Sequence, residues 1–191
     1  NAGKSSLLNR ITGAGVLVEN ALFATLDPTV RRSRTPDGRE FTVSDTVGFV
    51  RDLPHQLVAA FASTLEEVAH ADLMLHVVDA SHPDPEGQIA AVREVLADVP
   101  GASDVREVLV LNKADIADAE TLLRLRGRSE TTIEVSALTG EGITGLLDLL
   151  ADELPRLLEV GAIVGVADML EHAHRDDVVR LAFEQAVVLH L

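Results

Sequence analysis

Near its start the sequence reads Asn1-Ala2-Gly3-Lys4-Ser5-Ser6, in which a glycine is followed by a lysine and a serine. These three residues match the second half of the pattern G-x-x-x-x-G-K-[ST], which binds phosphates through backbone N–H groups and a lysine. We predict that Lys4 contacts the β- and γ-phosphates of a nucleotide and that the Ser5 hydroxyl is a ligand of Mg²⁺. The residues alone also allow a helix N-terminus rich in small residues.

A second motif, Asp45-Thr46-Val47-Gly48, follows a predicted strand. An aspartate there can hold Mg²⁺ through water, and the Gly48 N–H can approach the γ-phosphate because no Cβ stands in the way. The alternative is a simple turn at the end of a strand.

The third motif is Asn112-Lys113-Ala114-Asp115. The Asp115 carboxylate can accept hydrogen bonds from guanine N1–H and the 2-amino group, and adenine does not present both donors in that arrangement. Lys113 would lie over the base plane, and Asn112 would tie the base-binding loop to the phosphate-binding loop. Alternatively, Asp115 caps a helix over residues 116–126.

The fourth motif is Ser136-Ala137-Leu138, where the Ala137 N–H would face guanine O6. Alone it is typical of any turn from a strand into a helix. The four motifs occur in one order, however, and each falls at the end of the element that precedes it. Together they predict a guanine nucleotide site.

These motifs need a sheet to position them. Apolar runs at 73–78, 108–111 and 132–135 predict buried strands, and helical periodicity at 55–70, 85–99, 117–126 and 143–154 predicts helices between and around them. This alternation predicts a parallel sheet covered by helices on both faces, with ligands at the carboxyl ends of the strands. A helix from Gly3 to Ile11 and a hairpin turning at Pro36-Asp37-Gly38 precede them.

Composition limits the class of protein. The chain has 191 residues, a net charge of −15 and no cysteine. The charge argues against a broad basic face for duplex nucleic acid, although arginines cluster at 31–39. The absence of cysteine excludes a disulfide framework, and no apolar run reaches the length of about 18 residues that spans a bilayer. We expect a cytoplasmic protein, and a monomer.

Longer strings resemble one family. LFATLDPTVRR (22–32), DTVGFVRDLPHQLVAAFASTLEE (45–67) and LHVVDASHP (75–83) look like HflX-type GTPases, which are ribosome-associated, translation-factor-type P-loop GTPases. The resemblance covers residues 1–155. It implies a three-layer α/β/α G domain with a mostly parallel sheet, a Mg²⁺ cofactor, and GTP hydrolysis coupled to binding of the large ribosomal subunit and splitting of stalled ribosomes under stress.

The resemblance also assigns residues. Thr25 matches the threonine that closes on Mg²⁺, residues 14–30 match the first switch loop and residues 46–54 the second. The implied catalytic residues are Lys4, Thr25 and Gly48, and the metal ligands are Ser5, Thr25 and Asp45. The implied nucleotide contacts are Asn1, Ala2, Gly3, Lys4, Ser5, Ser6, Phe23, Ala24, Thr25, Leu26, Asp27, Asp45, Thr46, Val47, Gly48, Asn112, Lys113, Ala114, Asp115, Ser136, Ala137 and Leu138.

Two positions bear on hydrolysis. Phe49 stands where many GTPases place a glutamine that orients the attacking water, and an aromatic ring cannot do so. Slow intrinsic turnover is therefore expected, and a GTP-binding switch without efficient hydrolysis is an alternative, as is a GTPase of tRNA modification or ribosome assembly. Asn1 matches an asparagine that coordinates K⁺ in related TrmE-type GTPases, which makes K⁺ a second candidate cation.

The ends of the chain depart from the family pattern. The first phosphate-loop glycine and the first central strand would precede Asn1, so we expect the sheet to lack that strand. Its loss would leave two neighbouring strands without ladder partners, and residues 1–191 alone would then bind GTP poorly. Residues 156–191 do not resemble the usual C-terminal domain. We predict a divergent tail with one helix near 176–188.

Overall fold

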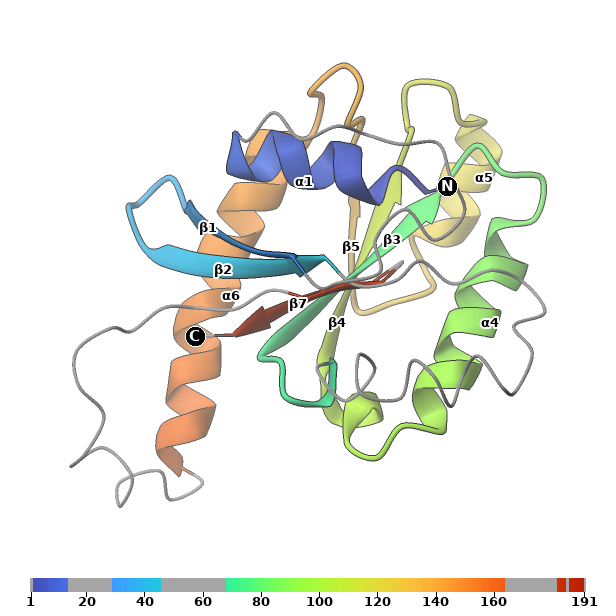
Figure 1. The fold of residues 1–191 in the computed structure, drawn as a ribbon. Helices are drawn as coiled ribbons and strands as arrows, with labels where there is room; N and C mark the ends of the chain where they lie inside the picture. The colour runs from blue at the N-terminus through green and yellow to red at the C-terminus, as the bar shows by residue number, and fades with distance from the viewer. Residues whose placement is uncertain (1, 14–28, 46–67, 164–181, 185, 191) are drawn as a thin grey trace.

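A seven-stranded sheet with helices on both faces forms the fold (Figure 1). The computed structural model describes residues 2–13, 29–45, 68–163, 182–184 and 186–190. The strand order is β1-β2-β6-β7-β3-β4-β5. The three-layer α/β/α architecture predicted from the sequence is confirmed.

The parallel part of the sheet consists of β3 (Leu73–Asp79), β4 (Arg106–Asn112) and β5 (Thr131–Glu134). β3 is buried along nearly its whole length, as its apolar run predicts. Helices α4 (Pro85–Ala97) and α5 (Ala119–Leu125) connect these strands, and a short 3₁₀ turn, Ala102–Asp104, precedes β4. Because the strands are parallel, Asp79, Asn112 and the residues after Glu134 reach one edge of the sheet.

The predicted hairpin is also present. β1 (Thr29–Arg34) pairs antiparallel with β2 (Glu40–Asp45), from Thr29 opposite Asp45 to Arg34 opposite Glu40. Gly38 has a φ of 91°, a conformation that glycine adopts without strain, and its N–H donates to the Thr35 carbonyl. This turn places Asp45 at the end of β2, as the sequence predicts.

The described helices cover both faces of the sheet (Figure 1). α1 (Lys4–Thr12) and α6 (Ile143–Ile163) share the main core with β2, β3 and β4. α4 and α5 pack on the opposite face, over residues such as Met74 and Leu109. The buried face of α1, formed by Leu7, Leu8 and Ile11, fixes the helix whose first turn carries the motif predicted to bind phosphate.

The C-terminal helix is longer than predicted. We expected it to end before Pro155, but α6 continues to Ile163 and crosses the predicted domain boundary. Proline has no N–H to donate to the carbonyl four residues earlier, here that of Ala151. The Arg39 guanidinium, from the β1–β2 hairpin, donates to that carbonyl instead. This contact explains how the helix passes a proline without leaving a carbonyl unsatisfied.

The end of the chain forms strands where we predicted a helix near 176–188. β6 (Ala182–Glu184) and β7 (Ala186–His190) lie between β2 and β3. β7 runs antiparallel to β3, with Leu73 opposite Leu189 and His76 opposite Ala186, and it also pairs with β2. The expectation that these neighbours lack ladder partners is therefore wrong. Without β7, the N–H and C=O groups of β2 and β3 that face each other would be unpaired. The apolar, β-branched sequence of β7 suits a strand that pairs with both of them.

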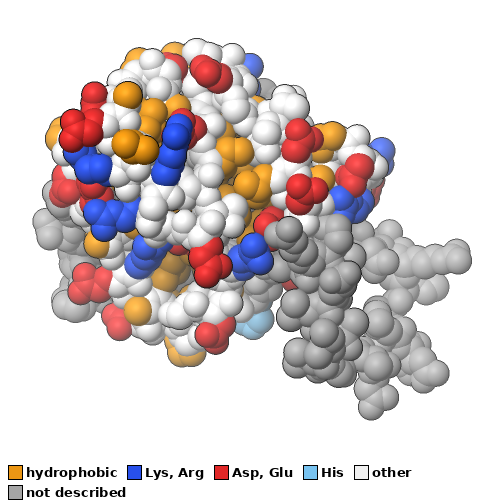
Figure 2. Space-filling view, turned by 180° about the vertical axis from the view of Figure 1, so that it is seen from behind, with side chains coloured by type: hydrophobic (Ala, Val, Ile, Leu, Met, Phe, Trp, Pro, Cys, Tyr) orange, Lys and Arg blue, Asp and Glu red, His pale blue; other side chains and the backbone are white. Residues whose placement is uncertain are grey.

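Charges of both signs are interspersed over the described part of the face seen from behind (Figure 2). Among the described helices, none is both long and apolar enough to cross a membrane.

Candidate functional site

Residues from three of the four motifs meet at the carboxyl edge of the parallel strands. The start of α1 lies beside the end of β3 there (Figure 1). Asn112 is the last residue of β4, and Ser136 follows β5 closely. The loops that leave these strands therefore share one edge with the turn that begins α1.

Asn112 joins two of these loops. Its side chain is buried, Nδ2 donates to the Ala2 carbonyl at 2.7 Å, and Oδ1 accepts from the Ala137 N–H at 2.9 Å. The first bond is the predicted tie between the base-binding and phosphate-binding loops. The second extends it to the Ser136–Leu138 turn. One amide thus holds the three segments in fixed relation.

Gly3 makes the close approach of Asn112 possible. Its φ is 83°, in the left-handed region, and a Cβ at this position would lie 2.4 Å from Asn112 Nδ2. Such a contact is impossible without movement of the amide. The N-cap glycine of α1 is therefore required both by backbone conformation and by the bridge.

Lys113 has an unusual backbone and a specific partner. Its φ of 62° is the one positive value among the described residues other than glycine. Its carbonyl accepts from the N–H groups of Ile116 and Ala117, both at 3.1 Å. Its ammonium pairs with the Asp79 carboxylate at the end of β3. Strained backbone of this kind is commonly found at functional sites.

The Asp79 carboxylate is held ionised. Burial raises its pKa, but hydrogen bonds from Lys113 and Ser81 oppose burial and leave the pKa below its ordinary value. The Ser81 N–H donates to Asp79 Oδ1 at 3.0 Å. A charged carboxylate thus anchors the lysine that was predicted to lie over the base.

Asp115 remains available for a ligand. The alternative was that it caps the following helix, but the cap of α5 is Asp118, whose carboxylate accepts from the Thr121 N–H at 3.1 Å. Asp115 is exposed. The structure therefore removes the capping explanation for this residue, and its contact with a base stays a prediction.

The Ser136–Leu138 turn is held at several points. Ser136 is buried, and its Oγ accepts from the Thr139 N–H at 3.0 Å. Arg10, in the last turn of α1, donates to the carbonyls of Ala137 and Leu138. The Ala137 N–H, which was predicted to face guanine O6, donates to Asn112 in this structure.

The residues predicted to bind phosphate begin α1. Lys4, Ser5 and Ser6 are half-buried in its first turn, and the Leu7 N–H donates to the Gly3 carbonyl at 2.9 Å. The backbone N–H groups and the positive dipole end at a helix N-terminus favour a phosphate there. Asp45 ends β2, and nothing is described of its side chain. The other predicted contacts, namely Asn1, Phe23, Ala24, Thr25, Leu26, Asp27, Thr46, Val47 and Gly48, lie outside the described residues.

Sequence reasoning missed Arg10 and Asp79. Asp79 carried a signal, because it closes a buried apolar strand in the string LHVVDASHP, although no nucleotide motif contains it. Arg10 carried none, since its partners are backbone carbonyls 127 and 128 positions away.

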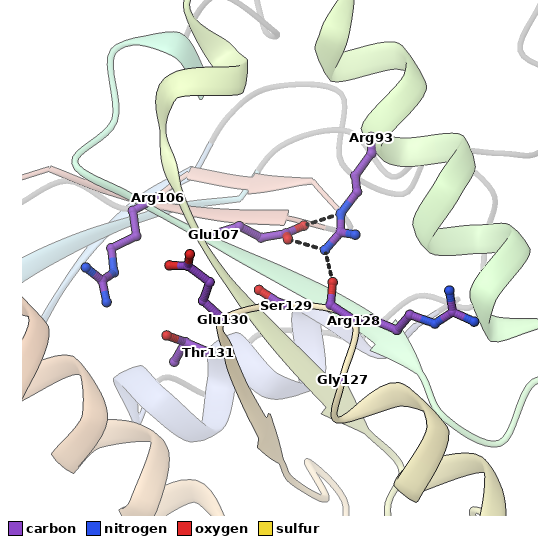
Figure 3. A pocket seen from close by; sticks show the side chains of 8 residues that line it. All are labelled: Arg93, Arg106, Glu107, Gly127, Arg128, Ser129, Glu130 and Thr131. Carbon is purple, nitrogen blue, oxygen red and sulfur yellow. Dashed lines mark hydrogen bonds and ion pairs between the residues drawn. The ribbon is translucent and has the colours of Figure 1, made fainter.

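A cavity of about 590 Å³ lies at the opposite edge, near the starts of β4 and β5 (Figure 3). Arg93 reaches Glu107 and the Arg128 carbonyl there, and Glu107 also contacts His76 Nδ1 at 2.7 Å. Burial raises the pKa of Glu107, but the bonds with His76 and Arg93 outweigh it and lower this pKa to about 2. Arg106 pairs with Glu153, so the charges of Arg93, Glu107 and Arg106 each have a partner of opposite charge within the protein.

Comparisons with known proteins identify related GTPases. A family model described as "50S ribosome-binding GTPase" matches residues 1–113. GTPase HflX of Lacrimispora saccharolytica is 50% identical over 150 residues, which make up 78% of this chain and 35% of that protein. GTPase HflX of Spirochaeta thermophila is 41% identical over 190 residues, 100% of this chain and 44% of that protein. The chain thus spans less than half the length of these relatives.

Two solved structures share the fold. A variant of SsGBP has a TM-score of 0.67 and 26% sequence identity, and the match covers 91% of this chain and 55% of that one. A variant of Era from Aquifex aeolicus, bound to GDP and AlF4⁻, has a TM-score of 0.61 and 22% identity, with coverage of 80% and 53%.

Proposed function

Because the chain belongs to the 50S ribosome-binding GTPases, and among them to the HflX type, we propose that it binds a guanine nucleotide and hydrolyses GTP. The observation that carries the proposal is the Asn112 bridge, with hydrogen bonds of 2.7 Å to the Ala2 carbonyl and 2.9 Å from the Ala137 N–H. It brings the phosphate-binding and base-binding segments to one edge of the sheet, which is where α/β sheets of this kind bind ligands.

In this proposal the base is recognised by Asp115 and Ala137. The exposed Asp115 carboxylate accepts from guanine N1–H and the 2-amino group, and the Ala137 N–H donates to O6. Lys113 lies against the base, anchored by Asp79. A base that lacks one of these hydrogen-bonding groups leaves a polar group of the protein unpaired. The free-energy cost of that unpaired group is the physical source of base discrimination.

The phosphates are held by the first turn of α1 and by Lys4. Magnesium suits the proposed donor set of the Ser5 and Thr25 hydroxyls and the Asp45 carboxylate, since this ion prefers oxygen ligands and keeps several waters. Ser5 stands in the first turn of α1, where a phosphate-bound ion can be reached. When bound, Mg²⁺ would neutralise charge on the phosphate oxygens. Asn1 is the proposed K⁺ ligand.

Thr25 and Gly48 contact the γ-phosphate side of the nucleotide, and Phe49 leaves the attacking water without a glutamine. Turnover is therefore slow until the large ribosomal subunit or a cation completes the site, and nucleotide state is coupled to ribosome binding and splitting.

Base specificity tests the proposal directly. Asp115→Asn replaces the acceptor with an amide that can donate to the O2 of xanthine, so the variant should lose affinity for GDP and gain affinity for XDP. Asp118→Asn is a matched control, because it changes an exposed aspartate three residues away that caps α5. Equal GDP affinity in Asp115→Asn and the unchanged protein would refute guanine recognition by this residue.

Hydrolysis needs a separate measurement on the full-length chain. Multiple-turnover GTP hydrolysis should rise when large ribosomal subunits are added and should be faster in K⁺ than in Na⁺ buffer. Nucleotide binding without turnover under any of these conditions would favour the switch without efficient hydrolysis. Turnover that ribosomes leave unchanged would favour a GTPase of tRNA modification.

A further inference from the structure

We infer that Arg10 is a positioning residue of the guanine site, which sets the direction of the Ala137 N–H and thereby the selectivity for the atom at position 6 of the base. The inference rests on the proposed guanine nucleotide site and adds a residue to it that no motif contains.

Arg10 connects the far end of the phosphate-binding helix to the base-binding turn. It belongs to the last turn of α1. Its Nε donates to the Ala137 carbonyl at 2.9 Å, and its Nη2 donates to the Leu138 carbonyl. Two donors of one planar guanidinium therefore engage two consecutive carbonyls. This geometry restrains orientation as well as distance, which a single point charge does not.

The two carbonyls belong to the peptide groups that follow the Ala137 N–H. That N–H is fixed on its other side by Asn112 Oδ1 at 2.9 Å. Rotation of the turn would therefore break the Asn112 contact, the Arg10 contacts or both. Since Leu138 is 79% exposed, the packing of the turn comes from Ala137 in the main core, and the Asn112 and Arg10 bonds fix the direction of its peptide groups.

The consequence is specific to one atom of the base. The Ala137 N–H is the group proposed to donate to O6, whereas the 2-amino group is read by Asp115. Removing Arg10 should weaken the contact at position 6 and leave the contact at position 2 intact. A general loss of structure would weaken both.

The test uses the full-length chain and three diphosphates, GDP, IDP and 6-thio-GDP. IDP keeps O6 and lacks the 2-amino group, and 6-thio-GDP carries sulfur, a weak acceptor, at position 6. Arg10→Ala should lower GDP affinity by about tenfold, which corresponds to about 1.4 kcal/mol. It should narrow the preference for GDP over 6-thio-GDP and leave the preference for GDP over IDP unchanged.

Two further variants complete the design. Arg10→Lys keeps the charge but lacks the planar guanidinium, so it should shift the ratio of GDP affinity to 6-thio-GDP affinity by a smaller factor. If Arg10→Ala does not fold, Arg10→Lys still provides the measurement. Arg34→Ala is the control, since Arg34 is an exposed arginine of the hairpin that pairs with Glu40. It should change neither ratio.

The outcomes separate this inference from the proposed function. If the unchanged protein binds GDP tightly and the Arg10 variants keep its ratio of GDP affinity to 6-thio-GDP affinity, the role of Arg10 is overturned. The proposed function is not affected by that result. Parallel loss of both preferences also overturns it, because that is the result of a disturbed fold. No binding of any guanine nucleotide by the unchanged protein overturns both the proposed function and the inference.

Discussion

The close approach of Asn112 to Gly3 allows a quantitative test of how the turn that begins α1 is held. Gly3→Ala adds a Cβ that would lie 2.4 Å from Asn112 Nδ2, and it places alanine at a φ of 83°. Asn112 must then move away from the Ala2 carbonyl to which it donates at 2.7 Å. The substitution therefore has two separable costs, one in the backbone and one in the bridge.

The two costs have known sizes. A residue other than glycine in the left-handed region loses about 1–2 kcal/mol. Loss of a buried hydrogen bond that leaves its acceptor unsatisfied adds about 1–3 kcal/mol. Gly3→Ala should thus lower the free energy of unfolding by about 2–5 kcal/mol in the unchanged background. With Asn112→Ala already present, the bridge is gone, and only the backbone cost of about 1–2 kcal/mol should remain.

A double-mutant cycle by urea unfolding measures the difference. The coupling energy between Gly3→Ala and Asn112→Ala should be about 1–3 kcal/mol. Gly13→Ala is the control, because Gly13 caps the other end of α1 with a φ of 66° and has nothing within 4 Å of an added Cβ. It should be additive with Asn112→Ala. Additive costs for Gly3→Ala as well would refute the steric role of its missing Cβ.

Three further predictions concern stability. Arg39→Ala should lower the free energy of unfolding by about 1–2 kcal/mol. The loss should be smaller in a Pro155→Ala background, because residue 155 then has an N–H that can donate to the Ala151 carbonyl. Equal losses of unfolding free energy in urea titrations of both backgrounds would contradict this. Glu107 has a pKa of about 2 against an ordinary 4.5, so its stabilising contribution is complete above about pH 4.5 and is lost as the pH falls toward 2. The difference in unfolding free energy between the unchanged protein and Glu107→Gln should therefore shrink over that range, and a difference independent of pH would argue against the His76–Glu107–Arg93 contacts. Asp118→Ala removes the cap of α5 and should cost about 1 kcal/mol in thermal unfolding, whereas Asp118→Asn should cost far less.

Much of the fold could be predicted because local patterns and the sheet agree. The apolar runs that became β3 and β4, residues 73–78 and 108–111, are buried at every position, so periodicity alone identifies them as interior strands. The region after Pro155 could not be predicted in this way. Both deviations, the continued helix and the strand β7, depend on partners distant in sequence, namely Arg39 and the edges of β2 and β3.

In the candidate site too, local patterns predicted some features, and others depend on residues distant in sequence. Motif spacing predicted that Gly3, Asn112 and Ala137 lie at one edge, and in the structure Asn112 accepts from the Ala137 N–H and donates to the carbonyl of Ala2, the residue before Gly3. Motif spacing could not predict that the Lys113 ammonium pairs with Asp79, because that ion pair joins the last residue of β3 to the residue after β4. Residues that must face a ligand occur in motifs with fixed spacing in the sequence. The residues that orient them act through backbone groups or through charges elsewhere in the chain, so they have no fixed spacing from the motifs.

The Ala137 N–H connects these observations to nucleotide binding. It carries one proton, which Asn112 Oδ1 accepts at 2.9 Å in this structure, and a bound guanine would offer O6 as a second acceptor. If O6 takes that proton, Asn112 still holds the Ala2 carbonyl through Nδ2, but it no longer holds the turn. The contacts that then remain on the turn include those of Arg10 with two carbonyls, the bond from the Thr139 N–H to Ser136 Oγ, and the core packing of Ala137. Arg10→Ala should accordingly reduce GDP affinity by a larger free energy than it removes from the unfolding free energy without nucleotide. A smaller effect on affinity than on unfolding would show that Asn112, not Arg10, keeps the turn in place when the base is bound.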